Sequence, residues 1–318
     1  MFTVLCVCLF INNYSCLYHS FFSKYYVLSC FCFASIAVNK HLYTKTMTLN
    51  LKKFDISTIT DDSVVVFIGK RRTGKSILLK NLLYYHRDIP IATIISSTES
   101  ANKFYGDIVP SLFIHDEISP ALLDNVVKRQ KIIRKQMDKL KRRSGSCNID
   151  PRALLVLDDC LHDKSWINMQ SIRELFLNGR HWKVFFMLTM QHPLGIPPSL
   201  RTNIDFVFIS RENNINNRRR IYDNYASMFP SFDMFCTVMD QCTENFECLV
   251  VQINAQSNKL QEQVFWYKAQ VHEHFKLGAK EFWDAHKENV DDDTDDEEMF
   301  DASLYKKKKH HVSVNKKS

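Results

Sequence analysis

Glycine and paired cysteines are both scarce in this chain. Only 7 of its 318 residues are glycine, so each glycine inside a motif carries more weight than usual. Five of the 10 cysteines lie in the first 46 residues, and the other five are scattered without CxxC spacing. This distribution argues against a disulfide framework and a paired-cysteine zinc site. It indicates isolated, reduced thiols.

Acidic residues are absent from residues 1–46, and so is any long apolar run. A signal peptide would need a basic region before its first apolar stretch, which this segment lacks. A membrane span would need about 18 uninterrupted apolar residues. We therefore interpret residues 1–46 as translated upstream sequence, with the natural start at Met47, and expect no stable membrane insertion. The interrupting polar residues are Asn12, Asn13, His19 and Lys24.

The rest of the chain has the composition of a soluble globular protein. Hydrophobic residues make up 45% and charged residues 24% of the whole sequence. The formal net charge of +7 permits a polyanionic partner without requiring one. An acidic run at 291–298 precedes a basic run at 306–309, and such runs are usually disordered. We therefore place one domain at 47–288 and a charged, disordered tail at 289–318.

Short apolar segments alternate with helical patterns along this domain. Short runs rich in β-branched residues are typical of buried strands in a parallel sheet. The alternation predicts an α/β fold, with a mainly parallel sheet covered by helices on both faces. The expected strands are 63–68, 91–95, 112–115, 153–157, 184–190 and 206–209, with a closing pair at 249–253 and 264–267. The expected helices are 77–85, 121–143, 166–177, 215–228 and 232–242.

A phosphate-binding motif follows the first expected strand. The pattern GxxxxGK[ST] is met in full, with a strand before it and a helix after it. Its glycines let backbone amides approach phosphate oxygens, and the helix adds its positive N-terminal end. Lys75 would reach the β- and γ-phosphates of ATP, and the Ser76 hydroxyl would bind Mg²⁺. The motif residues are Gly69, Lys70, Arg71, Arg72, Thr73, Gly74, Lys75 and Ser76.

Polar residues end two of the later strands. Asp158 and Asp159 follow the apolar run 154–157, where a P-loop enzyme holds Mg²⁺ and activates water. We assign Asp158 to the metal and Asp159 to the attacking water, with Gln191 at the next strand end as a γ-phosphate sensor. The alternatives are a loop with two solvated acids and an amide that caps a turn. If Asp159 is not the base, Glu99 and Glu117 are the next acids to consider.

Arginines near these strands are candidates for neutralising charge in the transition state. Arg180 and Arg201 lie in expected loops and would act from a neighbouring subunit, whereas Arg71 and Arg72 would act within their own chain. For any one of them, the alternative is a solvated or structural arginine.

The expected helix at 121–143 is strongly basic. A basic helix face can track a nucleic-acid backbone, although a solvated surface helix is the alternative. Between Lys128 and Arg143, only Asp138 offsets the positive charge. Its basic residues are Lys128, Arg129, Lys131, Arg134, Lys135, Lys139, Lys141, Arg142 and Arg143.

Two further stretches, at 176–181 and 188–205, carry a family resemblance. Together with the motifs they resemble the virion DNA-packaging ATPases of nucleocytoplasmic large DNA viruses (poxvirus-type), in the FtsK–HerA group of P-loop ATPases. The resemblance covers roughly residues 49–267 and implies a RecA/FtsK–HerA-like fold. It also implies a ring-like homo-oligomer that acts on double-stranded DNA. Cellular members usually have Glu where this chain has Asp159, whose side chain is shorter.

The function predicted from these features is ATP-driven packaging of viral DNA into a preformed particle. Capsid or portal components would be partners, and assembly sites in the host cytoplasm, or the virion itself, would be the location. Two other functions remain open. One is a P-loop nucleotide kinase, which would need an arginine-rich lid that we cannot locate. The other is a non-hydrolysing nucleotide-binding scaffold, for which the paired acids would be unnecessary.

Overall fold

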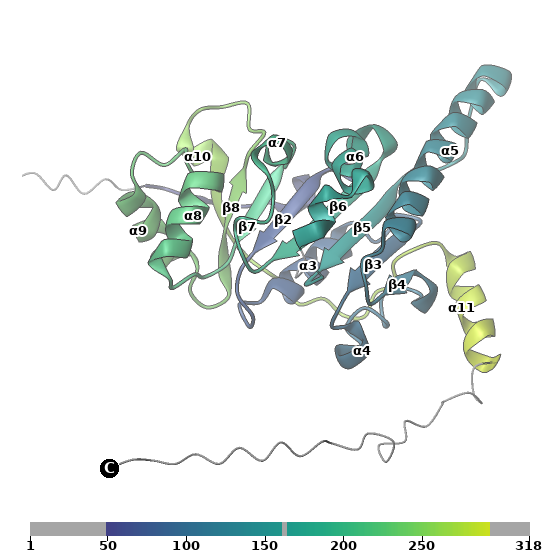
Figure 1. The fold of residues 1–318 in the computed structure, drawn as a ribbon, viewed down its shortest axis with the longest axis horizontal. Coiled ribbons are helices and arrows are strands. Elements are labelled where there is room, and N and C mark those ends of the chain that lie inside the picture. The colour runs from purple at the N-terminus through teal and green to yellow at the C-terminus, as the bar shows by residue number, and fades with distance from the viewer. Residues whose placement is uncertain (1–48, 161–163, 293–318) are drawn as a thin grey trace, which may run out of the picture. The chain divides into compact units, whose positions relative to one another are not determined.

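The computed structural model describes residues 49–160 and 164–292 (Figure 1). The predicted extension at 1–46 lies outside the described residues, as does the predicted tail beyond residue 292. The helix and strand labels below follow Figure 1.

Nine strands form one sheet in the described part of the chain, in the order β1-β9-β8-β7-β2-β6-β5-β3-β4. All neighbouring strands are parallel except β8, which runs antiparallel to both β7 and β9. The prediction of a mainly parallel sheet with a closing strand pair is confirmed, and the structure shows that this pair is antiparallel. The strands are β1 Lys52–Lys53, β2 Val64–Ile68, β3 Ala92–Ser96, β4 Ile114–His115, β5 Ala153–Asp158, β6 Val184–Met190, β7 Phe206–Ile209, β8 Glu247–Gln252 and β9 Val264–Lys268.

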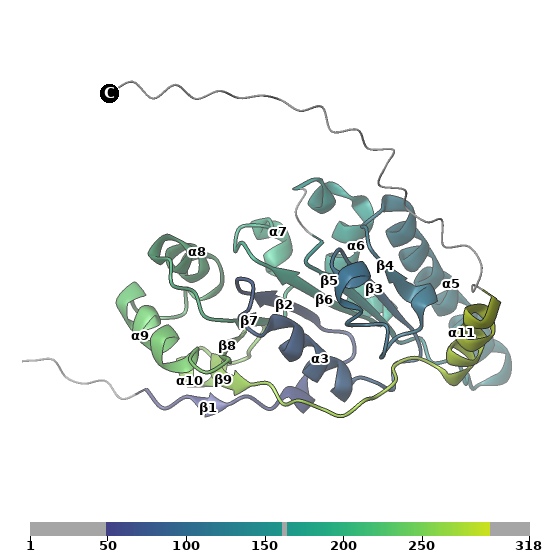
Figure 2. The ribbon, with the colours of Figure 1, turned by 90° about the horizontal axis from the view of Figure 1, so that it is seen from below.

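Helices connect these strands and cover both faces of the sheet. In Figure 2, α3 lies on one side of the sheet, and α6 and α7 lie on the other. The helices are α3 Lys75–Tyr85, α4 Glu99–Asn102, α5 Pro120–Ser144, α6 Gln170–Asn178, α7 Pro198–Arg201, α8 Ile215–Tyr225, α9 Phe232–Cys242, α10 Leu260–Gln263 and α11 Lys280–Asp292. Short 3-10 helices occupy Ile56–Thr58, Ser111–Phe113, Lys164–Asn168 and Gly179–Trp182.

The apolar strands are buried because each of their faces meets a different set of helices. Val65 and Phe67 of β2 join a core cluster that contains Leu79 of α3. On the opposite face, the ring of Phe186 in β6 packs edge-on against Phe176 of α6, with centroids 5.2 Å apart. A strand that is covered on both sides has no polar face, which explains the continuous apolar runs in the sequence.

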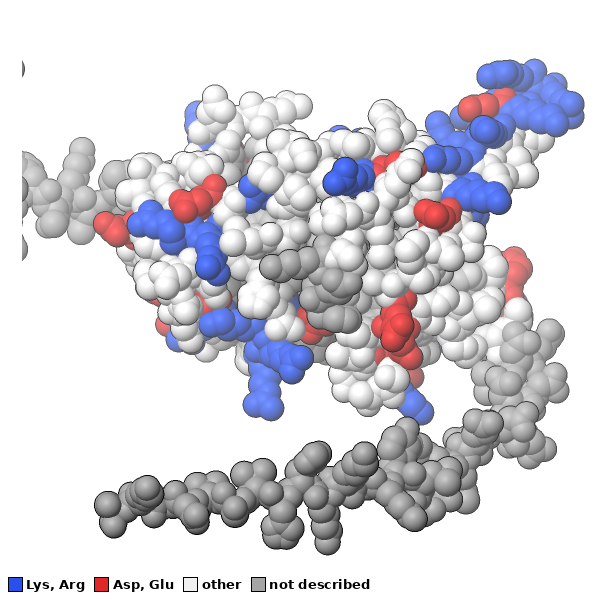
Figure 3. All heavy atoms as spheres, viewed as in Figure 1, with Lys and Arg blue, Asp and Glu red and all other residues white. Residues whose placement is uncertain are grey.

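Helix α5 has 25 residues and extends past the amino-terminal edge of the sheet that it packs against. It begins at a Ser119 cap, whose hydroxyl accepts from Leu122 N at 3.2 Å. Eleven residues into the helix, Gln130 Nε2 donates to the carbonyls of Pro151 and Trp182, just before β5 and β6 begin. Residues 131–144 therefore project roughly 20 Å past the amino-terminal edge of the sheet. Figures 1 and 3 show this projecting arm.

Several predicted boundaries differ from the structure. The strand expected at 112–115 is limited to Ile114–His115, because Phe113 N bonds back to Pro110 O and closes a 3-10 turn. The helix expected at 166–177 is a 3-10 turn followed by α6. Helix α11 was not predicted, and it continues past the expected domain end at 288. Among the described residues, no helix combines the length and apolar character needed to cross a bilayer.

Candidate active site

The P-loop connects the end of β2 to the start of α3. Lys75 is the first residue of α3 and is only 6% exposed. Its Nζ donates to the carbonyls of Gly69 at 2.7 Å and Lys70 at 2.9 Å. Burial lowers the pKa of this ammonium group, and the carboxylates of Asp159 and Asp158 oppose that shift. The loop therefore holds a partly desolvated positive charge against its own backbone.

Both glycines of the motif are required by the shape of this loop. A Cβ at Gly69 would lie 2.7 Å from Ser210 Cβ and 2.8 Å from Thr73 Oγ1, which are impossible contacts. Gly74 has φ +87°, a conformation that residues with side chains rarely adopt. A loop of this kind can turn its amides toward an anion, and the N-terminus of α3 adds to the attraction. These features fit a bound phosphate group.

Asp158 ends β5 and is 6% exposed. Its carboxylate accepts from Tyr105 Oη at 2.7 Å and from Thr189 Oγ1 at 2.8 Å. Burial raises the pKa of Asp158, and the two hydroxyl hydrogen bonds counteract the shift. Neutral donors therefore fix the orientation of the carboxylate without neutralising its charge.

Asp159 occupies a left-handed turn with φ 50°, directly after the strand. Its amide donates to Thr189 Oγ1 at 3.0 Å, and its carbonyl accepts from Ser97 Oγ at 2.8 Å. Its carboxylate accepts from Gln191 Nε2 at 2.9 Å. The structure thus joins the two strand-end residues that were assigned to water activation and phosphate sensing.

The sheet brings the sequence-predicted residues to one edge. Strand β6 lies between β2 and β5, with Ile68 opposite Met190 and Leu157 opposite Leu188. Gly69 N also donates to Met190 O at 3.0 Å, which ties the P-loop to the end of β6. The P-loop, the paired acids and the sensor amide therefore share the carboxyl edge of three neighbouring strands, the usual ligand site in such sheets.

Two contributors to this edge, Tyr105 and Thr189, were not identified from the sequence as site residues. Tyr105 and Thr189 orient the acids, and Glu99 fixes the loop that carries Tyr105. The Glu99 carboxylate accepts from the backbone amides of Phe104 at 3.0 Å and Gly106 at 2.8 Å, and from that of Tyr105 at 2.8 Å. Glu99, named as an alternative base, is therefore engaged in holding this loop.

The candidate metal ligands are few. Ser76 is exposed at the start of α3, and Asp158 is buried at the end of β5. No group of three or more histidine, cysteine or acidic side chains gathers as a metal site in the described residues. Mg²⁺ commonly keeps several waters and takes one or two protein carboxylates together with substrate phosphates, so a sparse ligand set fits it.

The candidate arginines lie apart from the P-loop, except for the two within it. Arg180 pairs with Asp205, whose other oxygen accepts from Val64 N at 2.8 Å, at the amino-terminal start of β2. Arg201 donates to Asn224 and lies over the Tyr225 ring, 5.7 Å from its centroid. Arg71 and Arg72 are exposed in the loop itself.

Residues 51–262 match the protein family described as Poxvirus A32 protein. This chain belongs to that family. The family membership inferred from its motifs is thus confirmed. A relative described as Uncharacterized protein L437, from Acanthamoeba polyphaga mimivirus, is 41% identical over 239 residues, covering 74% of this chain and 83% of the relative. Another, 075L of Invertebrate iridescent virus 6, is 37% identical over 253 residues, covering 76% and 94%.

More distant likenesses occur among solved structures. The A32-family chain is similar to the genome packaging NTPase B204 from Sulfolobus turreted icosahedral virus 2, in complex with AMP, with 16% identity and a TM-score of 0.44 over 67% of this chain and all of the other. It is also similar to the pCW3 conjugation coupling protein TcpA, with 14% identity and a TM-score of 0.43 over 69% and 62% of the two chains. At this distance neither structure assigns residues here.

Proposed function

We propose that this protein is a Mg²⁺-dependent ATPase that drives viral genomic DNA into virions. The observation that carries the proposal is the meeting of Lys75, the Asp158–Asp159 pair and Gln191 at one edge of the sheet. Membership in a viral family agrees with viral DNA as the cargo. A purely structural loop would have no need for an oriented pair of acids beside a buried lysine.

The P-loop would bind the triphosphate of ATP. Its backbone amides and the N-terminus of α3 would surround the phosphate oxygens, and Lys75 would contact the β- and γ-phosphates. Ser76 and Asp158 would hold Mg²⁺, which supplies positive charge to the phosphate oxygens when bound. When ATP binds, the Lys75 ammonium would give up its hydrogen bonds to the carbonyls of Gly69 and Lys70 and would contact the charged phosphates instead.

Asp159 would orient the attacking water and accept its proton. The hydrogen bond from Gln191 at 2.9 Å limits the rotation of this carboxylate. A positioned base commonly contributes a factor of about 10² to 10⁴ to a reaction rate. Asp is shorter than the Glu that cellular members usually carry, so Gln191 would compensate by fixing the direction of the carboxylate.

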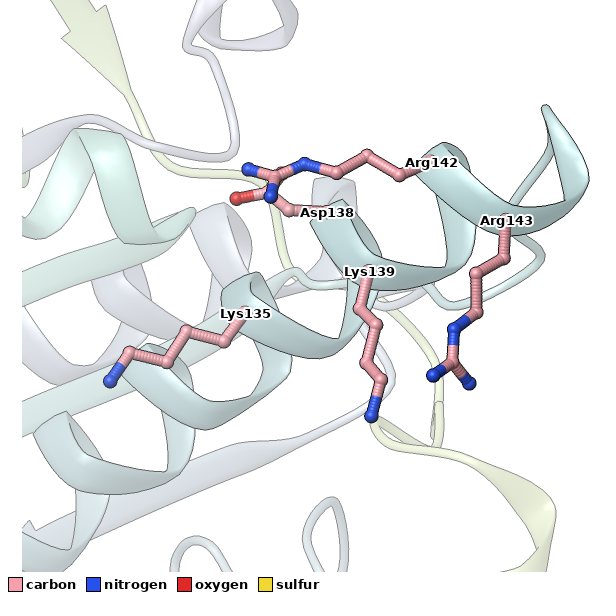
Figure 4. A pocket seen from close by; sticks show the side chains of 5 residues that line it. All are labelled: Lys135, Asp138, Lys139, Arg142 and Arg143. Atoms are coloured by element: carbon pink, nitrogen blue, oxygen red, sulfur yellow. The ribbon is translucent and has the colours of Figure 1, made fainter.

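The projecting arm of α5 would contact DNA. Figure 3 shows Lys and Arg side chains gathered at its tip, and Figure 4 shows Lys135, Lys139, Arg142 and Arg143 around a pocket there, with Asp138 as the acidic member. These five residues are exposed. Phosphate contacts by such residues give affinity without base specificity, as packaging of a whole genome requires.

A ring of subunits would complete the enzyme. Arg180 and Arg201 contact residues away from the P-loop of their own chain, so either would have to serve the site of a neighbouring subunit. The Arg180 side chain is 58% exposed and thus accessible to a neighbour. Capsid or portal components would anchor the ring at assembly sites in the host cytoplasm or within the virion.

Phosphate release from ATP, measured with and without duplex DNA, tests this function. A packaging ATPase should hydrolyse ATP with Mg²⁺ and respond to duplexes of unrelated sequence. A nucleotide kinase should instead transfer phosphate to a small acceptor and ignore DNA. A nucleotide-binding scaffold should bind ATP without turnover. Either of the last two results would contradict the proposal.

A further inference from the structure

An aromatic side chain lies against the P-loop on the side away from the acids. Phe246 is in the turn between α9 and β8. Because β8 is antiparallel to β7, with Leu249 opposite Ile209, this turn lies at the carboxyl edge of the parallel strands. A Cβ placed on Gly74 would be only 3.4 Å from Phe246 Cδ1. The ring therefore borders the loop that is proposed to hold phosphates.

The exposure and backbone of Phe246 are both costly. Its side chain is 71% exposed, which forfeits the stabilisation that burial of a phenylalanine provides. Single exposed apolar residues are common and need no explanation by themselves. Here, however, Asn245 and Phe246 have φ values of 50° and 63°, two consecutive left-handed residues that are not glycine. Such strain clusters at ligand sites, where the surrounding structure maintains it.

The two flanks of β2 carry different chemistry. Toward β6 and β5 lie the acids and the sensor amide, which suit the terminal phosphate and its attacking water. Toward β7 and β8 lie Phe246 and an ion pair, in which Lys70 of the P-loop contacts the buried Glu212 at 2.7 Å. A nucleotide whose γ-phosphate points to the acids has its base at the opposite end. That end falls on the aromatic flank.

We propose that Phe246 is the stacking wall for the base of the bound nucleotide, an inference that rests on the proposed ATP binding. An aromatic ring stacks on the π-face of any nucleobase, so Phe246 would add affinity without selecting adenine. The loss on truncation should be about tenfold in affinity. The strained turn would hold the ring in place before the base arrives, which reduces the entropy lost on binding.

Binding of ATP, GTP and inorganic tripolyphosphate to three proteins tests the proposal. Phe246→Ala should weaken the binding of ATP and of GTP by about tenfold. The affinity for tripolyphosphate should not change, because tripolyphosphate has no base to stack. Phe246→Trp should keep nucleotide affinity, and its added fluorescence should be quenched by ATP but not by tripolyphosphate. The signal from the 4 native tryptophans is subtracted using the unsubstituted protein.

Two further variants separate stacking from other effects. Phe246→Gly removes the ring and relieves the positive φ, so it should lose nucleotide affinity as the alanine variant does while gaining thermal stability. Val271→Ala shortens another exposed apolar side chain, 84% exposed, and should change neither property.

Three outcomes would overturn the stacking role. In the first, Phe246→Ala binds ATP like the unsubstituted protein while Lys75→Ala does not, and the proposed ATPase function then stands without the stacking wall. In the second, Phe246→Ala loses ATP and tripolyphosphate equally, which would make Phe246 a support for the P-loop. In the third, the unsubstituted protein binds neither ligand, and the proposed function itself fails.

Discussion

The acids at the amino-terminal edge of the sheet and the Asp158–Asp159 pair at the carboxyl edge are held in opposite ways. At the amino-terminal edge, acids next to the strand starts pair with bases of the same chain. At the carboxyl edge, neither Asp158 nor Asp159 forms an ion pair within the described residues, and their hydrogen-bond donors are hydroxyl, amide and backbone groups. The pairs at the amino-terminal edge are Arg152 with Asp61, Asp88 and Asp150, Lys183 with Asp62, and Arg180 with Asp205.

The pKa shifts follow the same division. Burial alone would raise the pKa of Asp61, but its hydrogen bonds with Arg152 and His86 hold the pKa below its usual value. Burial also raises the pKa of Asp158, and there the hydroxyl donors do not reverse the shift. An acid that is paired with a base of the same chain supports the fold. An acid that is oriented by hydrogen bonds but not paired remains available to a cationic or phosphorylated ligand. The four predictions below test this contrast.

The largest effect is expected at the carboxyl edge, from Lys75→Ala. This change removes a lysine that is buried beside the acids and held by the loop carbonyls. Hydrolysis of ATP should be abolished, because the β- and γ-phosphates lose their charged contact. Phosphate release is measured beside a thermal melt of each protein. A folded variant with near-normal turnover would refute the assignment of this loop to phosphate binding.

Asp159→Asn should separate binding from hydrolysis. The amide can still accept from Gln191, and Lys75, Ser76 and Asp158 remain to bind Mg-ATP. Turnover should drop by about a hundredfold or more, because an amide cannot take a proton from water. Nucleotide affinity from equilibrium binding and turnover from phosphate release are compared on the same samples. Undiminished turnover would transfer the role of base to another acid, with Glu117 next in line.

A variant of the α5 arm tests whether the amino-terminal side of the molecule has only a structural role. Replacing Arg134, Lys135 and Lys139 together by Gln should weaken DNA binding, reduce DNA-stimulated hydrolysis and flatten the salt dependence of binding. The reason is that fewer counterions are released from the DNA. ATP hydrolysis without DNA should not change, because the arm lies beyond the edge opposite the P-loop.

A matched control removes the same charge elsewhere. Lys52, Lys53 and Lys268 are exposed on β1 and β9, at the other end of the sheet from β4. Changing these three to Gln should leave the salt slope near that of the unsubstituted protein. Equal slopes for the arm variant, the control and the parent would mean that α5 is a solvated helix.

The smallest effect is expected from a substitution of His86, which lies among the ion pairs at the amino-terminal edge of the sheet. Its Nδ1 lies 2.5 Å from Asp61 Oδ1, but its Nε2 is buried without a hydrogen-bond partner in the described structure. Burial lowers the pKa of His86, and Asp61 and Asp88 oppose this shift while Arg152 adds to it. As the pH falls, His86 therefore takes up a proton at a higher pH in the unfolded state than in the native state. The free energy of unfolding should then decrease as the pH drops below about 6.5.

His86→Gln should make the free energy of unfolding less dependent on pH between 7 and 5. The difference in slope cannot exceed about 1.4 kcal/mol per pH unit, the limit for a single proton. Urea denaturation at several pH values measures it, and His274→Gln, at an exposed histidine, serves as the control. If both variants behave like the parent, the burial of His86 has no energetic consequence for protonation.

The fold was largely predictable because its signals are local. Runs such as 64–68 and 153–157 are apolar throughout, and a parallel sheet buried on both faces requires that pattern. Strand β1 was missed because Lys52–Lys53 is two exposed lysines, and only the edge of β9 makes it a strand. Helix α11 was missed because its last residues, Asp291 and Asp292, belong to the acidic run, and such runs are usually disordered.

The candidate site was predictable where a short motif or a polar residue at a strand end marked it. Gly69 to Ser76 and the pair Asp158–Asp159 are continuous in sequence, and the structure brings them together as expected. Thr189 was predicted only as part of a strand, although a buried hydroxyl in an apolar strand needs a partner and could have been suspected. Tyr105 and Phe246 have no such signal, because their positions depend on loops from distant parts of the chain.

The central place of β2 in the sheet has a consequence for protein synthesis. This strand is made early, at residues 64–68, yet its two neighbours are β6 at residues 184–190 and β7 at residues 206–209. On the ribosome, the nascent P-loop strand has both hydrogen-bonding edges unpaired until more than a hundred further residues have emerged. Exposed apolar edges of this kind favour aggregation. Folding of the nucleotide site must therefore be late, and this step is where a chaperone would have the most to protect.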